Sequence, residues 1–138
     1  MKTIPHIIFF ILIFYNPLSG QVTDSVKFKS LDPYYFHLNY LKEEPALLID
    51  VREFFEYRGR RIKDAVNIPS SGNLEFTADT IDKNCALFLY CTTDYRSIKA
   101  ARYFYDQGFS KLYSLEGGIV AWRREGMPVE KKRVRRKK

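Results

Sequence analysis

The residues best suited to chemistry in this chain are a cysteine, an arginine and a serine that follow one short apolar segment. Cys91 ends the run Leu87-Phe-Leu-Tyr-Cys91, and Arg96 and Ser97 follow after four intervening residues, at the start of an amphipathic segment. A cysteine is nucleophilic as its thiolate, and a nearby guanidinium and a helix N-terminus both favour that ionised form. The spacing therefore predicts a reactive thiol that faces the start of a helix.

Two elements must position this thiol. Residues 86–90 form an apolar run too short for a buried helix, which predicts an inner strand. A helix is predicted to begin at Ser97 and to end at Gly108, where a left-handed residue is favoured. Its predicted buried face comprises Ile98, Ala101 and Tyr105. In open α/β sheets ligands bind at the carboxyl ends of strands, so we expect the backbone N–H groups of residues 92–97 to converge near the thiol.

The rest of the chain predicts an α/β fold. Further strands are predicted at residues 46–50, 65–68 and 111–115, and helices from Asp32-Pro33, at 53–58, at 73–81 and after Gly117-Gly118. The buried face of the first helix is predicted to comprise Tyr35, Leu38 and Leu41, and Trp122 in the last helix is expected in the core. Strands that alternate with helices indicate a mostly parallel sheet with helices on both faces.

The segment Cys91-Thr-Thr-Asp-Tyr-Arg96-Ser97 resembles the active-site loop of the rhodanese-like sulfurtransferase family, in which Cys is followed after four residues by Arg and then Ser or Thr. Supporting segments are Leu48-Ile-Asp-Val-Arg-Glu53, Ala65-Val-Asn-Ile-Pro69, Leu115-Glu-Gly-Gly-Ile-Val-Ala-Trp122 and Gly126-Met-Pro-Val129. They occur in the family's order and spacing across residues 31–129. The resemblance implies a single rhodanese-like domain with a mostly parallel five-stranded sheet.

The resemblance also implies an activity. Cys91 would take a sulfane sulfur from a thiosulfate- or polysulfide-type donor, hold it as a persulfide and pass it to a thiol or cyanide acceptor. No metal or organic cofactor is required, because the cysteine itself is the carrier. The loop expected to surround the anionic sulfur comprises Thr92, Thr93, Asp94, Tyr95, Arg96 and Ser97. Ser97 is expected to cap or start the helix, and Tyr95 either flanks the mouth of the site or covers the sheet edge.

The resemblance also implies two supporting residues, Asp50 and Arg52. Two other functions are alternatives to sulfur transfer. Asp50 is expected to support the loops and Arg52 to add positive potential, the alternative being a surface salt bridge of little consequence. Cysteine phosphatases resemble this loop but have five residues between Cys and Arg. The four residues present here make a smaller ring, which favours sulfur over phosphate. A rival hypothesis is a catalytically weak rhodanese-like binding module of the cell envelope.

The chain departs from the family pattern at two places. Asp94 stands where many members have Gly and where the loop can require a positive φ, and its charge is expected to raise the pKa of the Cys91 thiol and to discourage anionic donors. The segment Arg60-Arg-Ile-Lys-Asp-Ala65 stands where the family commonly has Gly-His-Ile-Pro-Gly-Ala. The shape of that second loop therefore cannot be inferred from the resemblance.

The two ends of the chain predict export. Residues 1–20 have one early lysine, an apolar run from Ile7 to Tyr15 and small residues before Gln21, which is typical of a secretory signal peptide. A retained membrane anchor is the lesser alternative. We expect a polar lead-in at 21–30, the domain at 31–129 and a basic tail at 130–138, with the mature protein periplasmic or secreted. Because residues 85 and 91 bracket one strand, Cys85 and Cys91 are expected to be too far apart for a disulfide.

Charge is concentrated in the tail. The chain has 138 residues and a formal net charge of +7, and seven Lys and Arg residues fall within 131–138, so residues 1–130 carry no net charge. The tail lacks interleaved aromatic residues and gives no reason to expect specific nucleic-acid binding. A solvated end is the default, and attachment to an anionic envelope surface is the next interpretation.

Overall fold

The computed structural model of the chain describes residues 27–72 and 74–131, so the predicted signal peptide and most of the basic tail lie outside the described residues. The elements follow one another as β1 (Lys29–Leu31), α2 (Pro33–Lys42), β2 (Ala46–Asp50), α3 (Phe54–Gly59), β3 (Arg60–Ile62), β4 (Val66–Asn67), α4 (Leu74–Thr80), β5 (Ala86–Tyr90), α5 (Tyr95–Asp106), β6 (Leu112–Leu115), α6 (Gly118–Arg124) and β7 (Val129–Lys131). The predicted alternation of strands and helices is confirmed.

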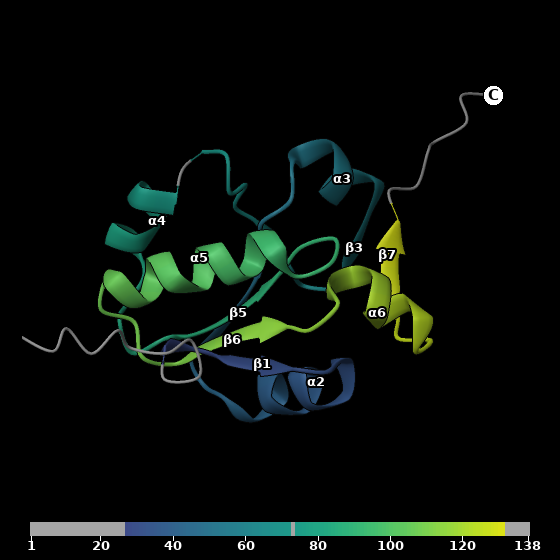
Figure 1. The fold of residues 1–138 in the computed structure, drawn as a ribbon, viewed down its shortest axis with the longest axis horizontal. Helices are drawn as coiled ribbons and strands as arrows, with labels where there is room; N and C mark the ends of the chain where they lie inside the picture. The colour runs from purple at the N-terminus through teal and green to yellow at the C-terminus, as the bar shows by residue number, and fades with distance from the viewer. Residues whose placement is uncertain (1–26, 73, 132–138) are drawn as a thin grey trace, which may run out of the picture.

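One five-stranded sheet organises the domain. Its strands lie in the order β1-β6-β5-β2-β4, and every neighbouring pair is parallel. The central strand β5 pairs with β2 along its whole length, from Ala46 beside Ala86 to Asp50 beside Tyr90. Figure 1 shows β5 and β6 side by side and running in the same direction. Because β2 is also parallel to β5, the residues after β2 and β5 emerge at the same edge of the sheet.

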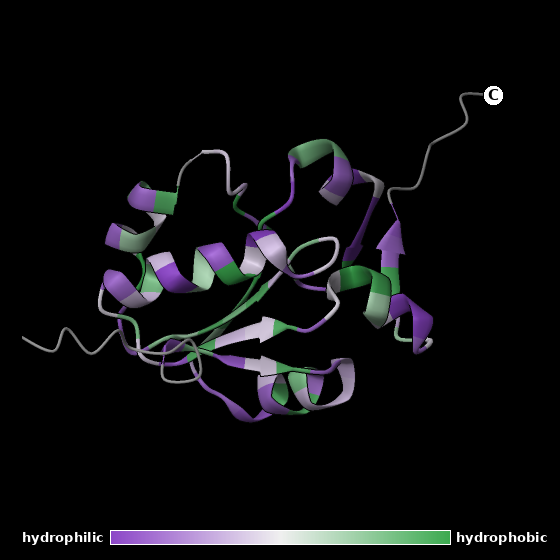
Figure 2. Cartoon of the chain, viewed as in Figure 1, coloured by the Kyte–Doolittle hydropathy of each residue, from purple (hydrophilic) through white to green (hydrophobic). Residues whose placement is uncertain are grey.

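Helices cover both faces of the sheet, as the sequence predicts. On one face α4 and α5 pack on Leu87, Leu89 and Cys91, and on the other α2 and α6 pack on Phe88 and Tyr90. Alternate residues of β5 therefore enter two separate cores, and all five residues of the strand are buried. Figure 2 shows β5 as a hydrophobic strand at the centre of the molecule.

The prediction for the buried face of α2 is wrong. Tyr35 and Leu41 are exposed, whereas Pro33 and Phe36 are buried. Phe36 and Tyr40 both pack edge-on against the Phe88 ring of β5. The helix carries apolar residues almost all round, and the aromatic contact with Phe88 decides which of them face the sheet. Its predicted start is confirmed, because Asp32 Oδ1 accepts a hydrogen bond from Tyr35 N at 2.9 Å.

A small antiparallel sheet lies outside the sequence-based prediction. Strand β3, within the segment that departs from the family pattern, pairs with β7, and Ile62 lies opposite Val129. The turn that follows β3 places Asp64 at φ 65°, and it is the one non-glycine residue with a positive φ in the described part of the chain. Asp tolerates this left-handed conformation better than most residues. The pairing joins the end of the chain to the middle of the domain.

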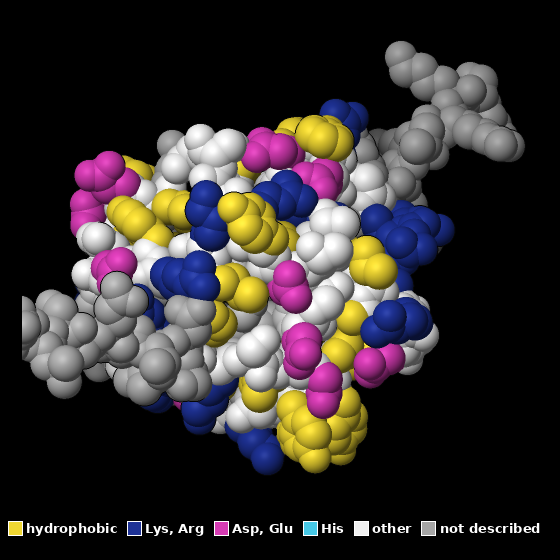
Figure 3. Space-filling model, viewed as in Figure 1, with side chains coloured by type: hydrophobic (Ala, Val, Ile, Leu, Met, Phe, Trp, Pro, Cys, Tyr) yellow, Lys and Arg dark blue, Asp and Glu magenta, His cyan; other side chains and the backbone are white. Residues whose placement is uncertain are grey.

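Helix α5 begins two residues earlier than predicted, at Tyr95 rather than Ser97. Its predicted end at Gly108 is confirmed, since Gly108 has φ 92° and Phe109 N donates to Phe104 O. Over this helix the viewed face of the molecule carries exposed Lys and Arg side chains beside hydrophobic ones (Figure 3). Across the two described ranges, no helix combines the length and the apolar character needed to cross a bilayer.

Candidate functional site

Cys91 lies directly after β5, beneath the start of α5. Its side chain continues the face of the sheet that carries Leu87 and Leu89, and it is 1% exposed. Ser97 Oγ lies 3.8 Å from its sulfur. The thiol therefore lies buried at the base of the loop that joins β5 to α5.

The loop is held from below by the start of α6. Ile119 N donates to Cys91 O at 2.9 Å, and Val120 N donates to Thr92 O at 3.2 Å. Gly118, with φ 57°, lies so close that a Cβ atom there would be 2.6 Å from Cys91 O and would also collide with Thr93 O. A residue without a Cβ at position 118 therefore lets the start of α6 approach the loop closely.

These contacts orient the peptide groups of the loop. In a trans peptide the C=O and N–H bonds point in opposite directions, so the N–H groups of Thr92 and Thr93 point away from α6. Among the described residues, no backbone N–H from Thr92 to Ser97 donates to a protein acceptor. Six main-chain donors in succession are thus available at the site, three of them from the first turn of α5.

Arg96 ties the loop to α3 through Glu56. Its guanidinium donates from Nη1 to Glu56 Oε2 at 2.7 Å and from Nη2 to Glu56 Oε1 at 2.9 Å. The Thr92 hydroxyl closes the network, accepting from Arg96 Nη2 and donating to Glu56 Oε1, each at 2.8 Å. This arrangement is the strong two-point geometry of an Arg–carboxylate pair.

The charges of this network act on one another. The hydrogen bond from Arg96, with further ones from Thr92 and Glu53 N, lowers the pKa of Glu56 to about 2. Conversely, the hydrogen bond to Glu56 raises the pKa of Arg96, and the charge of Cys91 contributes in the same direction. Arg96 is therefore close enough to Cys91 for the two charges to interact, although Glu56 engages the guanidinium first.

Ser97 is fully buried in the first turn of α5. Its hydroxyl donates to Asp94 O at 2.9 Å and accepts from the buried Ser114 Oγ at 3.0 Å. The prediction that Ser97 caps or starts the helix is wrong, because Asp94 is the N-cap and Tyr95 the first helical residue. The partner of Ser97, Ser114 on β6, is a residue that the sequence-based reasoning missed. The pair fixes one wall of the loop beside the Cys91 sulfur.

Asp94 and Tyr95 form the outer part of the loop. Asp94 precedes α5 with φ −156° and ψ −18°, so the expectation of a positive φ at this position is wrong. Its side chain makes no capping hydrogen bond. Tyr95 is 69% exposed, and Lys99 Nζ lies 5.6 Å from the centre of its ring. The Tyr95 ring thus lies at the surface.

Asp50 and Arg52 form a buried pair, so a surface salt bridge is ruled out. Arg52 Nε and Nη2 donate to Asp50 at 2.9 and 2.7 Å, and Nη2 also donates to Arg60 O at 2.6 Å. Burial acts to lower the pKa of Arg52, but the hydrogen bond and charge of Asp50 raise it overall. Burial, with Asp50, raises the pKa of Tyr90, whose hydroxyl accepts from Ile62 N. The pair braces the segments around the site, and Asp50 neutralises the charge of Arg52.

A hollow of about 310 Å³ lies beside the loop, between α3 and α6. Its lining comprises Arg52, Phe55, Glu56, Gly59, Arg60, Ile119 and Arg123. Neither Arg60 nor Arg123 forms an ion pair with another described residue. Glu56 and Asp50 are already paired with Arg96 and Arg52. The hollow therefore presents net positive charge next to the loop between β5 and α5.

Cys85 is separate from this site. Both cysteines are free, so the expected absence of a disulfide between them is confirmed. Cys85 is buried before β5, and burial raises the pKa of its thiol. Its sulfur is therefore protonated and a poor nucleophile. Within residues 27–72 and 74–131, no group of three or more His, Cys, Asp or Glu side chains is placed to hold a metal ion.

Comparison with known proteins identifies the family. The profile of the rhodanese-like domain family matches residues 36–125, and the chain belongs to this family. It is 34% identical over 86 residues to a sulfurtransferase of Allochromatium vinosum, a match that covers 62% of this chain and 79% of that protein.

Two further matches agree with this family and fold. The chain is 29% identical over 126 residues to a tRNA uridine(34) hydroxylase of Yersinia pestis, covering 79% of this chain but only 36% of that protein. Among solved structures, a rhodanese-like domain protein of Staphylococcus aureus matches with a TM-score of 0.64 and 28% identity, covering 76% of this chain and 99% of the other. The predicted family and the five-stranded α/β fold are confirmed.

Proposed function

We propose that this protein is a sulfurtransferase in which Cys91 carries a sulfane sulfur as a persulfide. The observation that carries the proposal is the run of unpartnered N–H groups from Thr92 to Ser97 in the loop that directly follows the buried Cys91 thiol. Family membership and the sulfurtransferase relative support the same activity. Such donors favour a negative charge on the terminal sulfur, as an oxyanion hole favours one on oxygen.

The transfer proceeds in two displacements. The Cys91 thiolate attacks the outer sulfur of the donor, the donor's S–S bond breaks, and the remainder leaves with the electron pair, as sulfite in the case of thiosulfate. A thiolate or cyanide then attacks the outer sulfur of the persulfide and restores the Cys91 thiolate. No external oxidant or reductant is consumed. The cysteine is the only group that changes covalently.

Each neighbouring residue has a distinct part in this scheme. Thr92 and Arg96 hold the loop closed through Glu56, while Thr93, Asp94 and Tyr95 supply backbone donors at the mouth. Ser97 supports the loop beside the sulfur, and the Asp50–Arg52 pair braces the segments below. The geometry of these contacts supports positioning roles for all of them, with Cys91 as the nucleophile.

The donor is anionic or polysulfide-like. The positive hollow lined by Arg60 and Arg123 favours an anion on its way to the loop. Asp94, at the end of the loop next to Cys91, acts against a doubly charged donor such as thiosulfate. These opposing charges favour an organic polysulfide, which carries no charge on the attacked sulfur, over thiosulfate.

A second candidate function is that of a catalytically weak binding module. The 1% exposure of Cys91 is the observation that favours it, because a sulfur without access to donors does not turn over. Steady-state assays with thiosulfate and polysulfide as donors and cyanide as acceptor separate the two functions. The sulfurtransferase gives thiocyanate in the wild type and in Cys85→Ser, but not in Cys91→Ser. No turnover with any donor supports the binding module.

We also propose that the protein is exported and that its small-molecule substrates are met outside the cytoplasm. The composition of residues 1–20 supports this location, and the basic residues 131–138 support attachment to an anionic envelope surface. Expression of the full chain in a Gram-negative host, followed by mass spectrometry of the periplasmic fraction, tests the first point. A mature N-terminus at Gln21 is expected, and an intact Met1 contradicts it.

A further inference from the structure

A second cavity lies on the opposite side of the sheet from the Cys91 loop. It has a volume of about 240 Å³ and is lined by Phe36, His37, Tyr40, Leu41, Leu48, Ile62, Lys63, Asp64, Trp122 and Pro128. None of these residues belongs to the loop or to the positive hollow beside it. An engineered apolar cavity of about 150 Å³ holds benzene, so this one is large enough for a one- or two-ring molecule.

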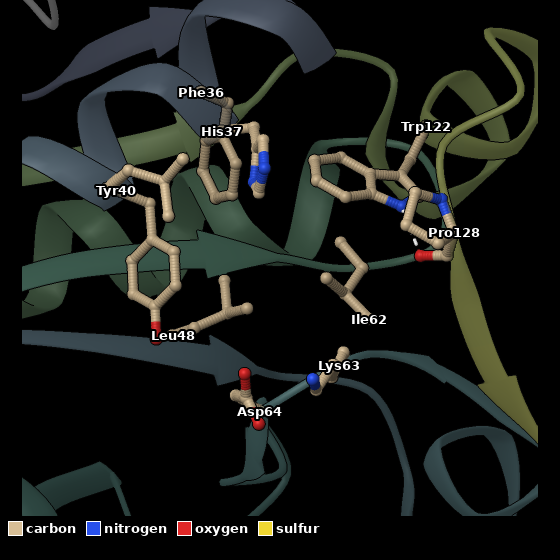
Figure 4. A pocket seen from close by; sticks show the side chains of 10 residues that line it. Phe36, His37, Tyr40, Leu48, Ile62, Lys63, Asp64, Trp122 and Pro128 are labelled. Carbon is tan, nitrogen blue, oxygen red and sulfur yellow. Dashed lines mark hydrogen bonds between the residues drawn. The ribbon is translucent and has the colours of Figure 1, made fainter.

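The walls of this cavity are aromatic. Phe36, His37 and Tyr40 project from α2, and Trp122 closes one end from α6 (Figure 4). The His37 and Trp122 rings pack edge-to-face, with centres 5.5 Å apart, and Trp122 Nε1 donates to Pro128 O at 2.9 Å. The indole is therefore held in place, with its N–H already engaged. Aromatic faces that converge in this way attract a cation as well as an apolar group.

One side of the cavity carries charge. Lys63 and Asp64 lie on the turn after β3, opposite α2 (Figure 4). No ion pair joins the two, and neither has a hydrogen-bond partner among the residues that the structure describes. The charge of Asp64 reaches the cavity, because it acts with burial to raise the pKa of Tyr40.

The two charges are not equivalent. Both side chains are exposed and line the cavity, but they differ in length. Asp64 has a short side chain, so its carboxylate remains near the cavity, whereas Lys63 has a flexible four-carbon stem and its ammonium is free to turn towards solvent. A positively charged ligand therefore meets a nearby counter-charge on a short side chain, whereas a negatively charged ligand meets a more mobile partner beside that carboxylate.

We propose that this cavity is a binding site for a small aromatic ammonium compound, with the ring among Phe36, Tyr40 and Trp122 and the ammonium group at Asp64. The size of the cavity, its aromatic walls and the short-chain carboxylate of Asp64 are the three observations that define this ligand class. The site is independent of sulfur transfer. A ligand there needs neither Cys91 nor a sulfur donor.

The single tryptophan of the chain gives a direct assay, because Trp122 lines the cavity. The full chain is titrated with three probes that share a phenylethyl group: phenethylammonium, 2-phenylethanol and 3-phenylpropionate. Fluorescence excited at the indole is expected to change and saturate in the order ammonium, alcohol, carboxylate. Asp64→Asn tolerates the same left-handed turn and is expected to weaken ammonium binding about threefold to fivefold, leaving alcohol binding unchanged.

Further variants keep the test decisive if Asp64→Asn proves unstable. Leu41→Lys, at an exposed position on the cavity lip, is expected to weaken ammonium binding, and Lys63→Gln to strengthen it. Asp106→Asn, on α5 across the sheet, is the control and leaves all three affinities unchanged. The proposal is overturned if no probe saturates, if 3-phenylpropionate binds best, or if the preference for ammonium survives Asp64→Asn and Leu41→Lys.

Discussion

Replacing Glu56 by Gln tests whether the ion pair between Glu56 on α3 and Arg96 stabilises the fold. Gln keeps the size of the side chain but loses the charge that pairs with Arg96. The folded protein lowers the pKa of Glu56 from 4.5 to about 2. At about 1.36 kcal/mol per pKa unit, that shift sets an upper bound of about 3.4 kcal/mol on its contribution to stability.

Solvent screening reduces this figure. The side chains of Glu56 and Arg96 are 20% and 30% exposed, so we expect about 1–2 kcal/mol at neutral pH. The sign follows from the direction of the shift. Because the folded-state pKa is the lower one, the stabilisation is fully present above pH 4.5 and is lost as the pH falls towards 2.

Urea unfolding of the wild type and Glu56→Gln at about pH 7, 4.5 and 2.5 measures this effect. Glu130→Gln is the matched control, since Glu130 forms a longer surface ion pair with Arg61 at 3.4 Å. The difference in unfolding free energy for Glu56→Gln is expected to shrink as the pH falls. The reasoning is refuted if this variant is no less stable than Glu130→Gln at pH 7, or if its deficit is the same at every pH.

Three further predictions concern the loop and its support. Asp94→Gly and Asp94→Asn are expected to raise the rate of sulfur transfer from thiosulfate equally, by about threefold to tenfold. The backbone at residue 94 needs no positive φ, so only the loss of charge matters. An unchanged or slower rate contradicts the charge argument. Gly118→Ala is expected to abolish sulfur transfer, because its Cβ would collide with the backbone of the loop. Gly126→Ala, at φ 73° with open space around its Cβ, is expected to keep the activity and to lose only about 1–2 kcal/mol of stability in chemical denaturation. Equal effects of the two variants refute the role of the close contact between Gly118 and the loop. Asp50→Asn leaves Arg52 charged and buried, so thermal and urea unfolding are expected to show a loss of about 3–5 kcal/mol, and a loss below 1 kcal/mol refutes a buried pair.

Local signals in the sequence were sufficient for the parts of the fold that depend on neighbouring residues. The apolar run of β5, the cap at Asp32 and the left-handed Gly108 each have a local physical cause, and each is observed. The placement of Cys91 at a strand end follows from the first of these. The loop itself was correctly located for the same reason.

Tertiary contacts explain what the sequence did not reveal. Glu56 meets Arg96 across 40 residues, and no local pattern in the sequence links the two residues. The pairing of β3 with β7 has no periodic pattern in either three-residue strand. Likewise, the buried face of α2 is set by the Phe88 ring rather than by the helix alone.

The central claim is that Cys91 accepts one sulfur atom, and the mass of the intact protein tests it most directly. After incubation with polysulfide and removal of excess donor, the wild type and Cys85→Ser are expected to gain one sulfur atom that cyanide then removes. Cys91→Ser is expected to gain none. Sulfur uptake by Cys91→Ser, or none by the wild type with either polysulfide or thiosulfate, contradicts the account.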